Sequence, residues 1–262
     1  MFYVLTAVLG AITGSFLNVC IFRLPKDESI VFPGSHCQSC KKPIVPLDNI
    51  PVISFLILKG RCRHCAVKIS FQYPLVEILS LCLFVLFYRY FGLTAKGILY
   101  LLFSLALLVE TFIDLKHQII PDVITLPGIL IGLAASTLFP SLHGQGLWWQ
   151  GLLKSSIGVL VGGGFFYIIG TIAGMILKKE ALGGGDIKLL AMIGGFLGWP
   201  GVAWTVFMSS VLGSGVGIYL RIKNGEERIP FGPYIAAGAF SYLFFGQEIT
   251  LWYAHLMGFY GN

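Results

Sequence analysis

Long apolar runs are the feature of this sequence that most restricts the folds open to it. Several of them are long enough to cross the hydrocarbon core of a bilayer, which is about 30 Å thick. Hydrophobic residues make up 56% of the chain and charged residues only 11%, with a mean hydropathy of +0.84. This composition excludes a soluble domain, a disordered chain, a coiled coil, a collagen and a small disulfide scaffold. We therefore predict an all-α polytopic membrane protein.

The apolar runs predict about eight transmembrane helices. The sixth is short, and glycines together with Pro200 interrupt the chain where it meets the seventh, so these two can also form one bent element. The predicted spans are residues 1–22, 74–91, 97–113, 119–139, 151–177, 187–197, 200–220 and 231–253.

The distribution of basic residues predicts the orientation. With residues 23–73 on the cytoplasmic side, fifteen of the eighteen Lys and Arg lie inside, and only Arg89, Lys96 and Lys154 lie outside. This arrangement satisfies the positive-inside rule and places both termini outside. The first run lacks a preceding basic segment, so we expect a retained anchor rather than a cleaved signal peptide. The net charge of +6 thus follows from membrane topology, and no nucleic-acid partner is predicted.

Two CxxC pairs lie in the long inner loop, Cys37 with Cys40 and Cys62 with Cys65, separated by 21 residues. Four thiolates at this spacing can complete a tetrahedral Zn²⁺ site with Zn–S distances of about 2.3 Å. Disulfides are disfavoured because the loop faces the reducing compartment. A closed four-thiolate site leaves no position for water, so the predicted zinc is structural, and it would help to fold a small zinc-ribbon-like insertion between the first two helices.

Acidic residues within or at the ends of apolar spans are costly in lipid and are therefore candidates for function. Asp114 ends the third predicted span, and Asp186 follows the glycines Gly183, Gly184 and Gly185 at the start of the sixth. The remaining acids of this kind are Glu77, Glu110 and Asp122. Both Asp114 and Asp186 are expected on the inner side, where two helix ends can bring them together across a cleft.

Two neighbouring carboxyls share one proton, because they cannot both ionise cheaply. Such a pair acts as a base towards water and as an acid towards a carbonyl oxygen, which hydrolyses a peptide bond directly. Gly183 and Gly185 would let a substrate backbone approach, and Lys188 would tune or pair with the acids. Asp186 and Asp122 are also explained as acids favoured at helix N-termini. Spacing alone does not choose between the dyad and an acid-lined pathway of a solute or proton carrier, and a non-catalytic assembly scaffold is a third alternative.

Five motifs, in this order, resemble those of the bacterial prepilin peptidases, also called type IV leader peptidases, over most of the chain. They are Gly14-Ser-Phe-Leu-Asn-Val-Cys-Ile-Phe-Arg-Leu-Pro25, the paired CxxC knuckles, Tyr73-Pro-Leu-Val-Glu77, Phe112-Ile-Asp-Leu-Lys-His-Gln-Ile-Ile-Pro-Asp122 and Gly183-Gly-Gly-Asp-Ile-Lys-Leu-Leu-Ala191.

The resemblance implies an aspartic endopeptidase of the GxGD type, with catalytic aspartates at Asp114 and Asp186, and it matches the four cysteines to the family's cysteine tetrad. Gly183, Gly185 and Lys188 are the supporting positions expected from the residues themselves. It implies cleavage of the basic leader of prepilins or pseudopilins at the cytoplasmic face of the bacterial inner membrane. In many members the new N-terminus is then methylated with S-adenosylmethionine. This chain lacks an ordinary Rossmann glycine fingerprint, so the sequence assigns no residue to that cofactor and no oligomeric state.

The predicted organisation has three parts. Residues 1–22 form the first transmembrane helix, residues 23–73 the cytoplasmic zinc-binding loop domain, and residues 74–262 the transmembrane aspartyl protease core.

Overall fold

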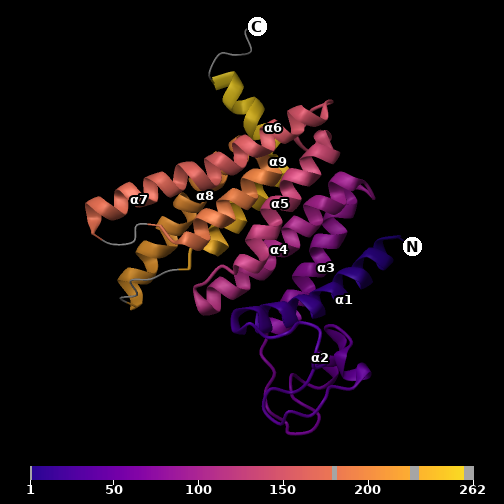
Figure 1. The fold of residues 1–262 in the computed structure, drawn as a ribbon. Coiled ribbons are helices and arrows are strands. Elements are labelled where there is room, and N and C mark those ends of the chain that lie inside the picture. Colours follow the sequence, from indigo (N-terminus) through magenta and orange to yellow (C-terminus); the bar gives the residue numbers. More distant parts are fainter. Residues whose placement is uncertain (1, 179–181, 225–229, 257–262) are drawn as a thin grey trace. The chain divides into compact units, whose positions relative to one another are not determined.

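The computed structural model describes residues 2–178, 182–224 and 230–256, which form helices joined by turns and loops (Figure 1). The chain divides into two compact units, Met1–Val109 and Glu110–Asn262, and the boundary falls within helix α4 (Ala95–His117). The all-helical prediction is confirmed for the described residues. Met1, the first residue of the first predicted span, lies outside them.

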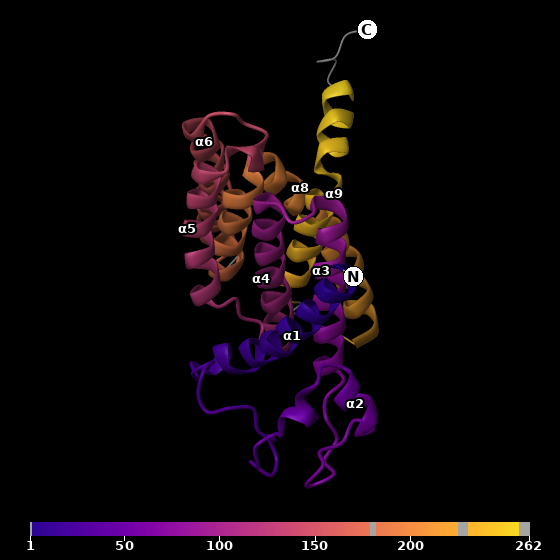
Figure 2. The same ribbon diagram turned by 90° about the vertical axis from the view of Figure 1, so that its right-hand side faces the viewer.

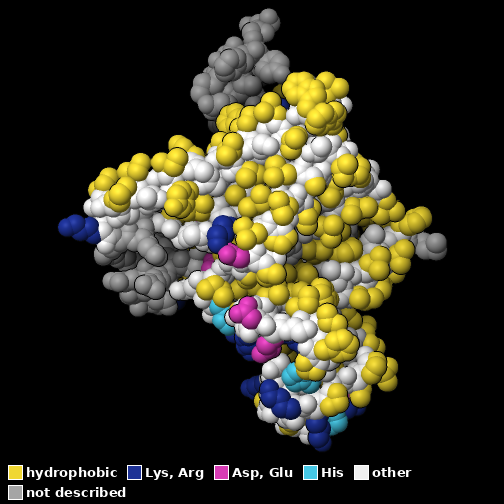
Figure 3. Space-filling model, in the orientation of Figure 1, with side chains coloured by type: hydrophobic (Ala, Val, Ile, Leu, Met, Phe, Trp, Pro, Cys, Tyr) yellow, Lys and Arg dark blue, Asp and Glu magenta, His cyan; other side chains and the backbone are white. Residues whose placement is uncertain are grey.

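Five helical segments of the described chain are long and apolar enough to cross a membrane. They are Phe2–Lys26, Gln72–Phe91, Ala95–His117, Trp148–Ile176 and Gly184–Leu220. A further apolar helix, α5 (Asp122–Leu138), is shorter. Figure 3 shows hydrophobic side chains over much of the visible helical surface, as expected of a chain solvated by lipid. The prediction of a membrane protein is therefore supported by five spans, whereas the count of eight stays a prediction.

Helices α1 (Phe2–Arg23) and α3 (Gln72–Phe91) pack side by side in the first unit (Figure 1). Gly10 and Gly14 of α1 form a GxxxG pair at the contact. A Cβ atom on Gly10 would lie 2.7 Å from the Cα of Leu81, and one on Gly14 would lie 2.6 Å from the Cα of Glu77. Only glycine permits this backbone approach, which is how membrane helices pack in the absence of a hydrophobic driving force between them.

The loop between α1 and α3 contains three short helices, η1 (Leu24–Lys26), η2 (Pro46–Asn49) and α2 (Ile53–Ile57). Figure 3 shows Lys, Arg and His side chains gathered on this segment. Arg23, buried at the end of α1, fixes the start of the loop, since its guanidinium donates to the carbonyls of Ser29 at 2.8 Å and Pro33 at 2.6 Å.

The second unit is a helical bundle arranged around α8 (Gly184–Asn224) (Figure 2). Helix α8 contacts α5, α6 (Trp148–Val159), α7 (Phe166–Leu177) and α9 (Gly232–Leu256). The short helix η3 (Pro140–His143) precedes α6, and the π-helical segment η4 (Leu160–Phe165) joins α6 to α7. The α6–η4–α7 run occupies the predicted fifth span.

Two helical segments that meet at a kink, labelled together as α8, occupy the predicted sixth and seventh spans. Gly198 has φ 70° and ψ 178° inside α8, and Pro200 follows it. Close to the kink, the carbonyl of Gly195 accepts hydrogen bonds from Ser155 Oγ at 2.7 Å and Ser136 Oγ at 3.2 Å. Serine hydroxyls satisfy backbone groups near broken membrane helices in this way, so the kink is supported by α5 and α6.

Candidate active site and four-cysteine cluster

The two CxxC segments fold into knuckles with the same hydrogen-bond pattern, 25 residues apart. In the first, the N–H of Cys37 donates to Lys42 and the N–H of Lys41 donates to Cys37, both at 2.9 Å. In the second, the N–H of Cys62 donates to Val67 and that of Ala66 donates to Cys62, also at 2.9 Å. Lys41 and Ala66 both adopt positive φ, at 58° and 55°. The loop thus contains two copies of one cysteine-bearing turn.

The four cysteine sulfurs of these knuckles gather in one cluster, with all four ligand atoms within 4.8 Å of one another. The sulfurs of Cys37 and Cys65 are 3.8 Å apart, which is about the separation that tetrahedral coordination at about 2.3 Å requires. The backbone N–H of Cys40 donates to the sulfur of Cys37 and lowers the pKa of that thiol to about 6. The cluster therefore offers four sulfur donors at a separation that suits a metal ion, and the thiol of Cys37 ionises readily. None of these four cysteines forms a disulfide.

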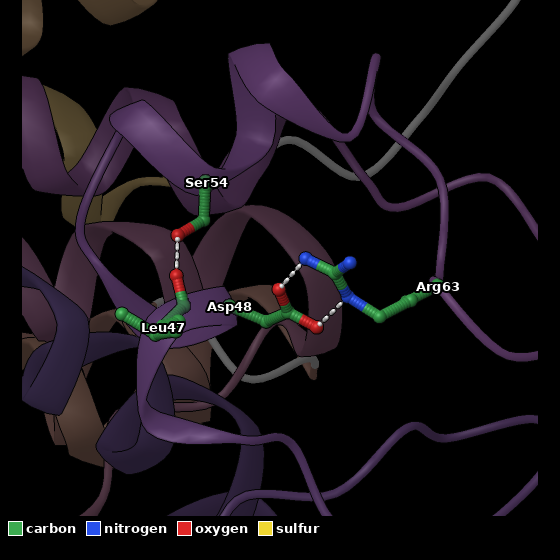
Figure 4. Close-up of polar contacts among 4 residues, drawn as sticks. All are labelled: Leu47, Asp48, Ser54 and Arg63. Carbon is green, nitrogen blue, oxygen red and sulfur yellow. Dashed lines mark hydrogen bonds and ion pairs between the residues drawn. The ribbon is translucent and has the colours of Figure 1, made fainter.

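An ion pair connects η2 to the second knuckle (Figure 4). The guanidinium of Arg63 donates to both carboxylate oxygens of Asp48, from Nε at 2.7 Å and from Nη2 at 2.5 Å. The hydroxyl of Ser54 also donates to the carbonyl of Leu47 at 2.8 Å, which holds α2 against η2. Arg63 lowers the pKa of Asp48 through this hydrogen bond and its positive charge. These contacts hold η2 against α2 and the second knuckle, so the loop is stabilised by polar contacts in addition to the cysteine cluster.

Asp114 lies near the C-terminus of α4 and is only 5% exposed. A carboxylate is electrostatically disfavoured there, because the helix dipole is negative at that end. The backbone N–H of Gly232, the first residue of α9, compensates by donating to Asp114 Oδ2 at 2.7 Å. A Cβ on Gly232 would lie 2.8 Å from the same oxygen, so glycine is needed for this approach.

Asp186 lies in the first turn of α8, where the helix dipole favours an acid. The two predicted catalytic acids both belong to the second unit, and the negative charge of Asp114 acts on Asp186. The neighbouring glycines have separate roles. A Cβ on Gly183 would lie 2.8 Å from Asp186 Oδ2, one on Gly185 would lie 2.9 Å from Ile120 Cβ, and one on Gly184 would meet nothing within 4 Å. Gly183 thus gives the Asp186 carboxyl room, and Gly185 lets α8 begin against Ile120.

Lys188 pairs with Asp122. Its Nζ lies 2.7 Å from both carboxylate oxygens, and this exposed ion pair joins the first turns of α5 and α8. Lys188 balances the charge of Asp122 at the edge of the site. Lys188, which we expected to tune or pair with the dyad, therefore pairs with Asp122 instead.

Two further intramembrane acids differ in their surroundings. In the first unit, Glu77 accepts the backbone N–H of Val52 at 2.7 Å through Oε2, as expected of a buried hydrogen-bonding partner. Glu110 lies one helical turn before Asp114, is 1% exposed and has no hydrogen-bond partner for either oxygen among the described residues. Glu110 is therefore a buried carboxyl group beside Asp114 with no hydrogen-bond donor in the described part of the chain.

The sequence interpretation did not identify Gly232. Its position within Pro230-Phe-Gly-Pro233, where the last apolar run begins, was the available signal. A glycine carries no functional group, so nothing in the sequence alone indicates that its N–H serves Asp114.

Two family descriptions match the chain. Residues 8–91 match the bacterial Peptidase A24 N-terminal domain, and residues 101–218 match the type IV leader peptidase family. A "Prepilin leader peptidase/N-methyltransferase" of Pseudomonas aeruginosa is 36% identical over 98% of this chain and 95% of its own length. One of the same description from Myxococcus xanthus is 39% identical over 86% of this chain and 65% of its own length.

A further relative from Escherichia coli is described as "Type 4 prepilin-like proteins leader peptide-processing enzyme". It is 36% identical over 92% of this chain and 93% of its own length. No solved structure matches the chain.

Proposed function

The chain belongs to the type IV leader peptidase family, and we propose that Asp114 and Asp186 are the catalytic pair with which it removes the leader of type IV prepilins or pseudopilins. It is a membrane aspartic protease, and its relatives are leader peptidases that also carry N-methyltransferase activity. Family membership favours this function over the carrier and the scaffold.

The observation that carries the proposal is the electrostatic proximity of Asp114 and Asp186 at two helix ends. Two carboxyls so placed share a proton, and the ionised member accepts a proton from the attacking water while the protonated member donates to the scissile carbonyl oxygen. The N–H of Gly232 holds one oxygen of Asp114, which leaves the other for the water or the shared proton. In this scheme Gly183, Gly185 and the Lys188–Asp122 pair position the start of α8.

The proposal includes a membrane arrangement. Eight spans with both termini outside would place the four-cysteine loop, Asp114 and Asp186 on the cytoplasmic side of the inner membrane, and the positive-inside rule supports this topology. A prepilin would then insert its apolar helix into the bilayer, with the leader junction at the inner interface. The functional division into residues 1–22, 23–73 and 74–262 belongs to the same proposal.

Zinc is the metal that four thiolates at this separation favour, and we propose one structural Zn²⁺ held by Cys37, Cys40, Cys62 and Cys65. S-adenosylmethionine would supply an electrophilic methyl group for the second reaction, methylation of the new N-terminal amine.

The experiment is mass spectrometry of a prepilin substrate after incubation with wild type, Asp114→Asn or Asp186→Asn in liposomes containing S-adenosylmethionine. Wild type should remove the leader and add one methyl group. Either Asn variant should lose cleavage at least a thousandfold while protein level and zinc content stay normal. Cleavage by both Asn variants would contradict the dyad, and proton flux without any cleavage by wild type would favour the carrier.

A further inference from the structure

The short helix α2 presents only apolar side chains on its outward face, the face turned away from the rest of the loop. On its inward face, Ser54 and Phe55 line, together with Glu77, a cavity of about 410 Å³ within the first unit. The residues of the outward face do not line this cavity and are 54%, 68% and 69% exposed: Ile53, Leu56 and Ile57. Their spacing of i, i+3 and i+4 places them side by side on the helix. A helix surrounded by water has a polar outward face, so α2 suits a less polar medium on this side.

Two contacts hold α2 at the end of α3, beside which it lies in Figure 2. The backbone N–H of Val52, which precedes α2, donates to Glu77 Oε2 at 2.7 Å. The rings of Phe55 and Phe71 lie 6.4 Å apart. Phe71 directly precedes α3, and Glu77 stands in its second turn, about 7.5 Å along the helix at a rise of 1.5 Å per residue. Helix α2 therefore stays within about two turns of the point where α3 begins.

Basic side chains follow α2 in the sequence. Residues 53–68 contain four Lys or Arg and no acid. Arg63 is paired within the loop (Figure 4). Lys59, Arg61 and Lys68 are exposed, and none of them forms an ion pair in the described part of the chain. Arg61 and Lys68 face each other across an antiparallel bridge, so all three charges lie close to the C-terminal end of α2.

We propose that the outward face of α2 docks on the headgroup layer of the membrane that α1 and α3 cross, with its three apolar side chains inserted among anionic phospholipids. The headgroup layer on each side of a bilayer is about 5–8 Å thick, which matches the distance over which Phe71 and Glu77 hold α2 along α3. An apolar helical face with basic neighbours is typical of segments that lie in the membrane interface.

The three basic residues complement the lipid phosphates. An anionic membrane surface attracts Lys and Arg over about one Debye length, about 8 Å, so charges a few residues beyond α2 contribute. Docking would hold the four-cysteine loop against the membrane surface. The inference goes beyond the leader peptidase function and does not rest on it, because it requires only that α1 and α3 span the membrane.

The test is photocrosslinking of the full chain in mixed phosphatidylcholine and phosphatidylglycerol vesicles, with a phosphatidylglycerol probe that carries a diazirine on its acyl chain. Mass spectrometry after trypsin digestion measures the labelled fraction of residues 42–59, which contain α2. Wild type should be labelled there, and the double variant Leu56→Asn, Ile57→Asn at least fivefold less. Val31→Asn removes an apolar side chain that is 66% exposed elsewhere in the loop, and its labelling should stay within twofold of wild type. Labelling of α1 and α3 in each sample standardises membrane insertion.

A second probe tests the charges. Wild type should be labelled at least threefold more by the phosphatidylglycerol probe than by a phosphatidylcholine probe with the same acyl chain. The triple variant Lys59→Gln, Arg61→Gln, Lys68→Gln should lose this preference. Equal labelling of wild type by the two probes would overturn the anionic lipid as the occupant.

An unlabelled segment 42–59 in wild type, or equal labelling of wild type and the Leu56→Asn, Ile57→Asn variant, would overturn docking on the membrane. Labelling that disappears when prepilin is added, together with a raised KM for cleavage in that variant, would also overturn it and would assign the outward face to the substrate. Leader cleavage by wild type is measured in the same vesicles, so a failure of the peptidase function would be seen separately.

Discussion

The backbone N–H of Gly232 donates to Asp114 Oδ2 across 2.7 Å, and the two residues are 118 positions apart in the sequence. This hydrogen bond ties the N-terminus of α9 to the last turns of α4, where the carboxylate would otherwise face the negative end of the helix dipole. The start of α9 is therefore part of the candidate active site.

Gly232→Ala should reduce leader cleavage at least tenfold. The added methyl group would lie 2.8 Å from Asp114 Oδ2, so that either the carboxyl or the start of α9 must move. The control is Gly215→Ala in α8, where a Cβ meets nothing within 4 Å, and its cleavage rate should stay within twofold of wild type. Rates can be followed by gel shift of a prepilin substrate. A fully active Gly232→Ala would show that this contact is dispensable.

Lys188→Met and Asp122→Asn should lower cleavage by a similar, modest factor, about threefold to tenfold. The exposed ion pair contributes little stability by itself, but it links the first turns of α5 and α8 beside Asp186. If Lys188 and Asp122 act only through each other, the cleavage rate of the double variant should be no lower than that of either single variant. Additive losses in this double-mutant cycle would instead indicate that Lys188 acts directly on the dyad.

Purified protein should contain about one zinc ion per chain, measured by atomic emission. Cys37→Ser should lower the zinc content and increase proteolysis of the four-cysteine loop, because a bound metal would contribute to folding of this segment. Cys20→Ser, which changes a buried cysteine of α1 outside the cluster, should leave the zinc content unchanged. A full complement of zinc in Cys37→Ser would contradict the four-cysteine assignment.

Asp48→Asn should speed amide hydrogen exchange in the loop. The ratio of the exchange rate in the variant to that in wild type, measured at the same pH, should be constant between pH 5 and 8. Arg63 lowers the pKa of Asp48 in the folded protein, so the stabilisation is present above the unfolded pKa of about 3.9 and is lost as the pH falls through the lowered value. The exchange rates of the variant and of wild type should therefore converge below about pH 4. Glu28→Gln serves as a control for the loss of one loop carboxylate. A difference that varied across pH 5–8 would point to another titrating group.

Elements that depend on local pattern could be predicted from the amino-acid sequence. Apolar runs placed the long helices of the described chain to within a few residues, since a run of this length requires lipid or a core wherever it occurs. The CxxC spacing identified the four cysteines that cluster, because two ligands three positions apart approach one ion through a single turn. The same reasoning put Asp114 and Asp186 among five candidate acids, because an acid in an apolar span is costly wherever the helix packs.

Packing within each unit determines which distant groups meet. The pairing of Lys188 with Asp122, the hydrogen bond of Gly232 to Asp114 and the amide of Asn18 held by Tyr73 all join residues from different helices or segments. Such contacts depend on helix rotation and approach, which small residues such as Gly10 and Gly14 permit without any chemical signature of their own. The cavity beside Glu77 belongs to the same class, because its wall comes from segments that only packing brings together.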